Sequence, residues 1–180
     1  MIAGPGLGAT WDKKLLRAVG AAVGTEARAV HNNQTGSNRP AQANGMGITL
    51  YSPNMNLVRD PRWGRNQEVY SECPRLSSAL TASFVRGVQR GSAPSPSLDG
   101  PVEGAAPSKY LQAGACCKHL VAYDVETNRM SNDAQVPARS FWEFYVPTFH
   151  SCLVEAEAMS SMCSCEASTT AALSAAASMF

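Results

Sequence analysis

The sequence predicts an α/β fold and, within that class, part of a (β/α)8 barrel. Segments with helical spacing of apolar residues alternate with short apolar segments typical of buried strands. This alternation is typical of parallel strands that are joined by helices. The chain has 180 residues, whereas a complete (β/α)8 barrel takes about 250. About three strands and three long helices are expected, so a partial barrel is predicted.

The first predicted helix covers residues 10–32. Thr10 is a suitable cap because its hydroxyl can accept a backbone N–H of the first turn. The apolar residues that recur at helical spacing are Trp11, Leu15, Val19, Val23 and Val30. This stripe is expected to face the core, and the polar segment 32–45 that follows is expected to be a loop.

The other two helices begin near Pro74 and near residue 138. Proline is favoured at a first helical position, and Cys73 before it is a weak cap. The third helix runs to about residue 156, and Pro147 is expected to kink it. The apolar stripes are Leu76, Leu80, Phe84 and Val88 in one helix and Phe141, Tyr145, Phe149 and Leu153 in the other.

Strands are predicted at residues 46–53, 113–123 and 158–164, each a short apolar segment. Residues 91–109 hold four prolines and three glycines, which predicts a surface loop or insertion without a core of its own. From residue 165 to 180 the chain is rich in Ala and Ser. This last segment is interpreted as a divergent tail.

Composition excludes several classes of function. The formal net charge is +1, which gives no electrostatic case for nucleic acid or for an acidic membrane as a partner. No run of 18 or more apolar residues predicts a membrane span. The first residues, MIAGPGLGATWDKK, lack the basic and apolar regions of a signal peptide as they stand.

The six cysteines do not indicate a dense disulfide framework, and we interpret them as small buried apolar residues. A zinc site is the alternative if the second and third strands are neighbours. Its ligands would be Cys116, Cys117, His119, Cys163 and Cys165. Their spacing is not that of a standard zinc finger or ribbon, and adjacent strand residues point to opposite faces. No metal site is therefore predicted.

Polar residues follow each predicted strand, where α/β folds place their sites. The candidates are Asp60, Arg62 and Arg65 after the first strand, Lys118 and His119 in the second, and Ser164 and Cys165 after the third. If Lys118 and His119 are to reach one ligand, the backbone between them must be irregular. The structural alternatives are a solvated Lys118, a loop-capping His119, and a salt bridge from Arg65 to Asp60, Glu68 or Glu72.

Three long motifs resemble the N-terminal barrel domain of family 3 glycoside hydrolases, in its β-xylosidase, α-L-arabinofuranosidase and β-glucosidase branch. They are GITLYSPNMNLVRDPRWGRNQEVYSECP, ACCKHLVAYD and SCLVEAEAMSSMCS, and EARAVHN before them fits the same branch. The resemblance covers residues 8–164. It implies that Arg65, Lys118 and His119 hold sugar hydroxyls, that oligosaccharides or aryl and alkyl glycosides are the ligands, that no cofactor is needed, and that the location is extracellular or in the cell wall.

The chain also departs from the family pattern. Cys165 and Glu166 stand where the family has Tyr and Asn, and Cys73 stands where it has an Asp cap. The Ser-Asp-Trp-like segment with the family's catalytic aspartate does not occur after Ser164, so no catalytic residue is assigned. Two hypotheses follow: this is a fragment of a retaining glycosidase of terminal β-linked glucose, xylose or arabinose, or it is an inactive truncated copy with at most weak sugar binding.

Overall fold

Three parallel strands form the centre of the computed structural model. The residues that the structure describes are 4–35, 47–91 and 110–164. The strands are β1 (Thr49–Leu50), β2 (Gly114–Leu120) and β3 (Ser160–Cys163), and β2 lies between the other two. Both strand pairs are parallel, so each connection has to cross back over the sheet, and helices make these crossings. The predicted α/β class is confirmed.

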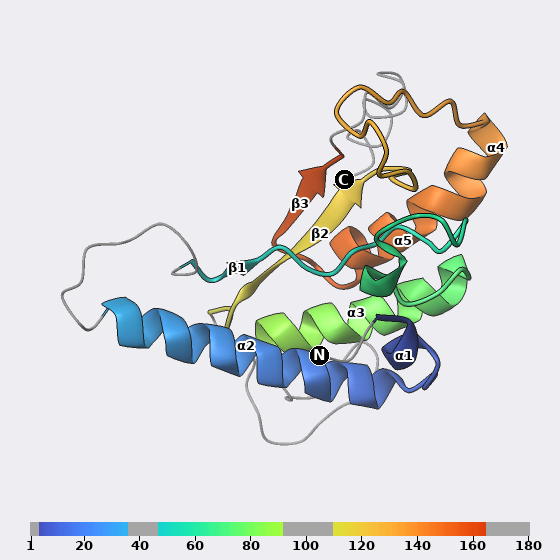
Figure 1. Cartoon of the computed structure of the whole chain (residues 1–180). Coiled ribbons are helices and arrows are strands. Elements are labelled where there is room, and N and C mark those ends of the chain that lie inside the picture. Colours follow the sequence, from blue (N-terminus) through green and yellow to red (C-terminus); the bar gives the residue numbers. More distant parts are fainter. Residues whose placement is uncertain (1–3, 36–46, 92–109, 165–180) are drawn as a thin grey trace.

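The helices pack around one central member, α3. The helical elements are α1 (Gly4–Gly8), α2 (Lys13–Thr35), η1 (Asn66–Glu68), α3 (Pro74–Arg90), α4 (Ala138–Ser140), η2 (Phe141–Tyr145), α5 (Val146–His150) and η3 (Ser151–Glu155). Helix α3 lies beside α2 and also contacts β2, α5 and η3 (Figure 1). Every residue from 80 to 89 is consequently buried, and the core of the described residues lies on both sides of this helix.

The first long helix begins later than predicted, because Asp12 rather than Thr10 caps it. A carboxylate oxygen of Asp12 accepts the backbone N–H groups of Lys14 and Leu15 at 2.8 and 3.1 Å. The Thr10 hydroxyl instead donates to the carbonyl oxygen of Leu7, 2.6 Å away. The carboxylate of Asp12 is the preferred capping group of the two, so α2 begins after Asp12.

The apolar stripe predicted for this helix was wrong in three positions, which are largely exposed. They are Trp11, Leu15 and Val30, at 73%, 40% and 47% exposure. The buried face contains Leu16, Gly20 and Gly24. A Cβ atom added at either glycine would lie well inside contact distance of an α3 carbonyl oxygen. The backbones of the two helices are thus in close contact. A search for large apolar residues at helical spacing does not identify a contact face that is made of glycines.

The other two predicted helices are confirmed. Helix α3 begins at Pro74, and Cys73 makes no side-chain capping bond. The third helix is continuous from Ala138 to Glu155, but the turns on both sides of α5 have π geometry. Pro147 lies between them and lacks the N–H that a regular α-helix would use there. The residues of its predicted stripe, Phe141, Tyr145 and Phe149, are buried, with Leu153 packed against them.

The first strand is shorter than predicted, although its pairing with β2 continues beyond its regular part. The N–H groups of Cys116 and Lys118 donate to the carbonyl oxygens of Ser52 and Pro53, each at 3.1 Å. Proline has no N–H that could donate to a carbonyl oxygen of β2. The segment after Leu50 therefore follows β2 without forming a regular ladder. This contact directs the loop that contains Arg65 toward the carboxyl end of β2.

The interpretation of the six cysteines as small buried apolar residues is wrong for at least four of them. Cys117 of β2 and Cys152 of η3 form a disulfide, with Cα atoms 6.6 Å apart. Cys116 is free and buried, as an apolar residue would be, whereas Cys73 and Cys163 are free and exposed. The disulfide joins the central strand to the third helix across the core.

Several predictions concern residues outside those that the structure describes. They are the loop or insertion within 92–109, the segment 36–46 and the tail 165–180. No helix among the described residues is long and apolar enough to cross a membrane.

Candidate functional site

Arg65 and Lys118 meet at one carboxylate, that of Glu68, and His119 lies beside Arg65. Arg65 lies in the loop after β1, and the other two residues lie near the end of β2. Parallel strands end at the same edge of a sheet, so both segments deliver side chains to one place. Three of the residues predicted from the sequence are thereby brought together, and the structure adds Glu68 as the group between them.

Glu68 accepts hydrogen bonds from two directions. Arg65 grips it with two parallel bonds, Nε to Oε1 at 2.7 Å and Nη2 to Oε2 at 2.6 Å. Asn54 donates its amide Nδ2 to the same Oε2 at 3.2 Å, and the Lys118 ammonium lies 3.8 Å from it. The salt bridge weighed as a structural alternative for Arg65 is therefore present, with Glu68 and not with Asp60 or Glu72.

The backbone at the end of β2 is irregular, as predicted for two adjacent residues that share one site. The register between β2 and β3 shifts between Lys118 and Leu120. His119 Nε2 lies 3.4 Å from Nη1 of Arg65. Both residues consequently reach the Arg65–Glu68 pair from neighbouring positions of one strand.

A wall of aromatic rings supports the cluster from within. The Tyr123 ring lies edge-on to Trp63 at 6.1 Å between centroids and 5.1 Å from the His119 ring. The Arg65 guanidinium carbon lies 5.5 Å from the centre of the same Tyr123 ring. Trp63 and Tyr123 are 4% and 1% exposed. The Tyr123 ring thus packs against both Arg65 and His119, and Trp63 packs against Tyr123.

Hydrogen bonds within the loop that contains Arg65 stabilise its conformation. Arg62 donates to the Asp60 carboxylate through Nε at 2.9 Å, and the Asn66 amide donates to the Asp60 carbonyl oxygen at 2.7 Å. Hydrogen bonds from Arg62 keep the pKa of Asp60 well below its ordinary value. The Arg62 side chain is 89% exposed, so this pair stabilises the loop and does not enter the cluster.

Burial and neighbouring charge set the protonation state of the cluster. Burial first, and then the charges of Arg65 and Lys118, lower the pKa of His119 from 6.5 to about 4, so the imidazole is neutral at pH 7. Burial also lowers the pKa of Lys118. Burial would raise the pKa of Glu68, but hydrogen bonds from Arg65 and Asn54 and the charges of Arg65 and Lys118 together hold it below its ordinary value.

One nitrogen of the His119 imidazole has no hydrogen-bond partner among the residues that the structure describes. Arginine nitrogens only donate, so Nε2 facing Arg65 is the acceptor and the proton of the neutral ring lies on Nδ1. Nδ1 is buried and makes no hydrogen bond to the described residues. Unsatisfied buried polar groups are rare in native proteins and are concentrated at functional sites.

The third predicted position lies at the end of β3. The Ser164 N–H donates to the carbonyl oxygen of Leu120 at 2.7 Å, which ties the end of β3 to the end of β2, and Cys165 lies outside the described residues. Within residues 4–35, 47–91 and 110–164, no three metal-binding side chains come together. Cys117, one of the considered zinc ligands, is in the disulfide.

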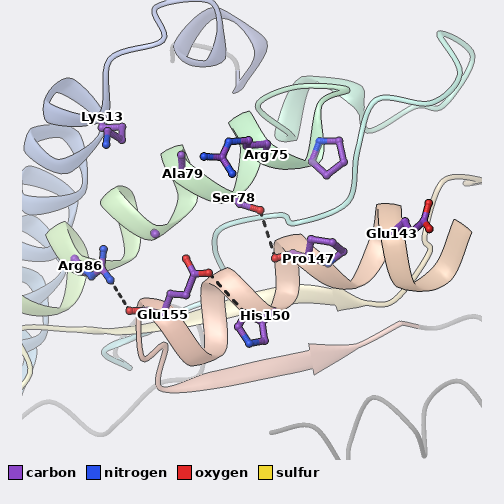
Figure 2. Close-up of a pocket in the computed structure, with 11 residues that line it drawn as sticks. Lys13, Arg75, Ser78, Ala79, Arg86, Glu143, Pro147, His150 and Glu155 are labelled. Atoms are coloured by element: carbon purple, nitrogen blue, oxygen red, sulfur yellow. Dashed lines mark hydrogen bonds and ion pairs between the residues drawn. The ribbon is translucent and has the colours of Figure 1, made fainter. Parts of the chain in front are cut away.

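A groove of about 490 Å³ lies elsewhere, between α3 and the third helix. Its lining residues are Lys13, Pro74, Arg75, Ser78, Ala79, Ala82, Arg86, Glu143, Pro147, His150 and Glu155. Figure 2 shows the bonds that join its two walls, from Ser78 to the Pro147 carbonyl oxygen and from Arg86 to the Glu155 carbonyl oxygen. None of the residues predicted for the site lines this groove.

Sequence reasoning missed Glu68 and Tyr123. Glu68 was considered only as a salt-bridge partner of Arg65, yet it is the centre of the cluster. Its position three residues after Arg65, within one helical turn, was the available signal. Tyr123 had a weaker signal, an aromatic residue at the end of the predicted strand 113–123.

Comparisons with known proteins agree on one family. Residues 3–178 match the family model described as the glycosyl hydrolase family 3 N terminal domain. Beta-D-xylosidase 3 of Arabidopsis thaliana is 36% identical over 160 residues, which are 87% of this chain and 18% of that protein. Beta-xylosidase/alpha-L-arabinofuranosidase 2 of Medicago sativa subsp. varia is 36% identical over 88% of this chain and 18% of its own length.

Solved structures give the same result. A GH3 exo-beta-xylosidase in complex with a xylobiose aziridine activity-based probe superposes with a TM-score of 0.72 and 30% identity, over 90% of this chain and 18% of that one. Beta-glucosidase 3B from Thermotoga neapolitana in complex with alpha-D-glucose gives 0.67 and 33%, over 91% and 18%. The chain thus spans about a fifth of the length of these relatives, and its three strands correspond to part of their barrel domain.

Proposed function

The chain belongs to glycoside hydrolase family 3, and we propose that it carries part of the sugar-binding site of a retaining hydrolase of O-glycosyl bonds. The proposed substrates are oligosaccharides or aryl and alkyl glycosides with a terminal β-linked glucose, xylose or arabinose. The observation that supports this most is the meeting of Arg65, Lys118 and His119 around Glu68 at the carboxyl ends of two parallel strands.

The chemistry of these groups suits a sugar ring. Arg65 and Lys118 are fixed cationic donors, and Glu68 is an acceptor that stays ionised at neutral pH. Sugar hydroxyls both donate and accept, so one ring can bond to both kinds of group. Several such bonds hold the ring in the distorted shape that precedes an oxocarbenium-like transition state. The role proposed for the cluster is therefore positioning and distortion, not bond cleavage.

We further propose that the 180-residue chain does not hydrolyse glycosides by itself. Retaining glycosidases need two carboxylates about 5 Å apart on either side of the scissile bond. The described cluster contains one carboxylate, and two hydrogen bonds from Arg65 hold it. The inactive truncated copy is the second candidate, favoured by Cys165 and Glu166 at positions where the family has Tyr and Asn.

The test combines sugar binding with hydrolysis by the purified chain. NMR titration with xylose and with glucose should show weak binding that Arg65→Ala and Lys118→Ala abolish. Arg62→Ala is the matched control, because Arg62 lies in the same loop and is bonded only to Asp60 among the described contacts of its side chain. Turnover of aryl β-xyloside or β-glucoside above buffer, lost in Arg65→Ala, would contradict the proposed inactivity. Equal binding by all three variants would refute the assigned site.

Sequencing of the transcript separates the fragment from the inactive copy. A reading frame beyond codon 165 that encodes a Ser-Asp-Trp-like strand would support a fragment of an active enzyme. A frame without such a strand would support the inactive copy.

We propose an extracellular or cell-wall location for the protein. The disulfide between Cys117 and Cys152 supports this, because such bonds persist mainly in oxidising compartments. An antibody raised against the chain should detect the protein in cell-wall or medium fractions. Detection in the cell interior alone would contradict the proposal.

A further inference from the structure

Three side chains outside the candidate site connect its two loops to the third helix. Arg59 donates from Nη1 to the Tyr145 hydroxyl at 3.1 Å, and that hydroxyl donates to the carboxylate of Asp124. The Arg59 guanidinium also lies over the ring of Phe144, 4.6 Å from its centre. We call this series of contacts, Arg59 to Tyr145 to Asp124, the tyrosine relay.

Each end of the tyrosine relay lies in a segment that contributes to the site. Arg59 belongs to the same loop as Arg65, and Asp124 directly follows Tyr123. The Tyr123 ring is the surface on which Arg65 and His119 rest, at 5.5 and 5.1 Å. The relay therefore joins, through one hydroxyl on the third helix, the start of one site loop to the residue next to Tyr123. Tyr123 itself donates its N–H to Asn56 and its hydroxyl to Glu126, so the relay adds to these bonds.

The central members of the relay are held firmly. Tyr145 is 7% exposed, and its backbone carbonyl oxygen accepts the hydroxyl of buried Thr148 at 3.0 Å. Burial raises the pKa of Asp124, and the Tyr145 hydrogen bond and the charge of Arg59 oppose that rise. The second oxygen of Asp124 makes no hydrogen bond to the described residues. Tyr145 is thus the sole hydrogen-bond donor that the described residues offer to a largely buried carboxylate.

We propose that Tyr145 is a positioning residue for sugar binding, acting through Asp124 to hold Tyr123 against Arg65 and His119. This inference rests on the proposed function only for its effect on sugar affinity. Its structural part, the placement of the Tyr123 ring, stands independently of any ligand. Loss of the Tyr145 hydroxyl should free Asp124 and let the segment that contains Tyr123 move away from His119.

The test replaces Tyr145 by phenylalanine, which removes only the hydroxyl. In Tyr145→Phe we expect weaker nuclear Overhauser contacts between the His119 and Tyr123 rings and shifted ring resonances of both. Xylose affinity should fall about fivefold, the effect of one lost hydrogen bond. The matched control is Tyr51→Phe, because Tyr51 is 63% exposed and lies at the end of β1. It should leave the ring contacts and the affinity unchanged.

A second pair of variants keeps the proposal testable if Tyr145→Phe does not fold. Asp124→Asn retains an acceptor for the Tyr145 hydroxyl and should preserve the His119–Tyr123 contact, whereas Asp124→Ala should lose it. Preserved ring contacts in both Tyr145→Phe and Asp124→Ala would overturn the inference. Absence of sugar binding in the unmodified protein would refute the proposed function, and the ring contacts would still decide the role of Tyr145.

Discussion

His119 should remain a neutral imidazole far below the pH at which an exposed histidine gains a proton. Its pKa is lowered from 6.5 to about 4, first by burial and then by the charges of Arg65 and Lys118, and the residue is 7% exposed. This difference corresponds to about 3 kcal/mol against protonation in the folded protein. NMR titration of the His119 ring protons should therefore show no midpoint between about pH 7 and pH 5.

The same difference makes folding stability depend on pH with a definite sign. The unfolded chain binds a proton at this residue as the pH falls through 6.5, whereas the folded chain does not until about pH 4. The unfolded state therefore gains protons first, and lowering the pH destabilises the fold. At about pH 5 the free energy of unfolding should have lost about 2 kcal/mol through this residue, relative to neutral pH.

The assay compares His119→Gln with the unmodified protein in urea at neutral pH and at about pH 5. Glutamine does not titrate, so the variant should lack this part of the pH dependence, while the contribution of the carboxylates cancels in the comparison. Lys118→Met should raise the His119 midpoint only in part, since burial is the larger cause. A midpoint near 6.5 in the folded protein, or the same loss of stability in both proteins, would refute the reasoning.

Three further predictions concern contacts that stabilise the fold away from the candidate site. Gln89→Leu should lower the free energy of unfolding by about 3 kcal/mol, because the buried amide makes hydrogen bonds to three backbone groups at 2.8 to 3.2 Å. Urea denaturation measures this loss, and Gln135→Leu at an exposed loop position is the control. Gly24→Ala should cost about 1–3 kcal/mol through overpacking, since its Cβ would meet an α3 carbonyl oxygen, whereas Gly47→Ala meets no atom within 4 Å and should change little. Thiol titration of the denatured, unreduced chain should find Cys117 and Cys152 unreactive, and two additional thiols after reduction.

The sequence predicted those parts of the fold that depend on large apolar residues and on strand order. The third helix was predicted correctly because Phe141, Tyr145 and Phe149 recur at helical spacing and are all buried. Arg65 and the Lys118–His119 pair were expected near each other because parallel strands end at one edge, and they do meet there. Neither prediction required knowledge of a tertiary contact.

The parts that were missed depend on contacts between distant segments. The glycine face of α2 exists only because the α3 backbone lies against it. The disulfide requires β2 and η3 to face each other, which the positions of Cys117 and Cys152 in the sequence do not reveal. The place of Tyr123 in the candidate site depends on the distant loop with Trp63 and Arg65, which packs against its ring.

The position of Glu68 changes the role that the sequence suggests for Arg65. Two of the three guanidinium nitrogens already bond to Glu68, and the third, Nη1, faces His119. Arg65 therefore does not present a free fork to two neighbouring hydroxyls. A sugar hydroxyl that approaches the cluster meets Nη1 of Arg65, the Lys118 ammonium and the carboxylate that both cations neutralise. Because Glu68 can accept from a hydroxyl while Arg65 and Lys118 donate to its neighbours, the sugar-binding unit that we propose is the ion pair as a whole.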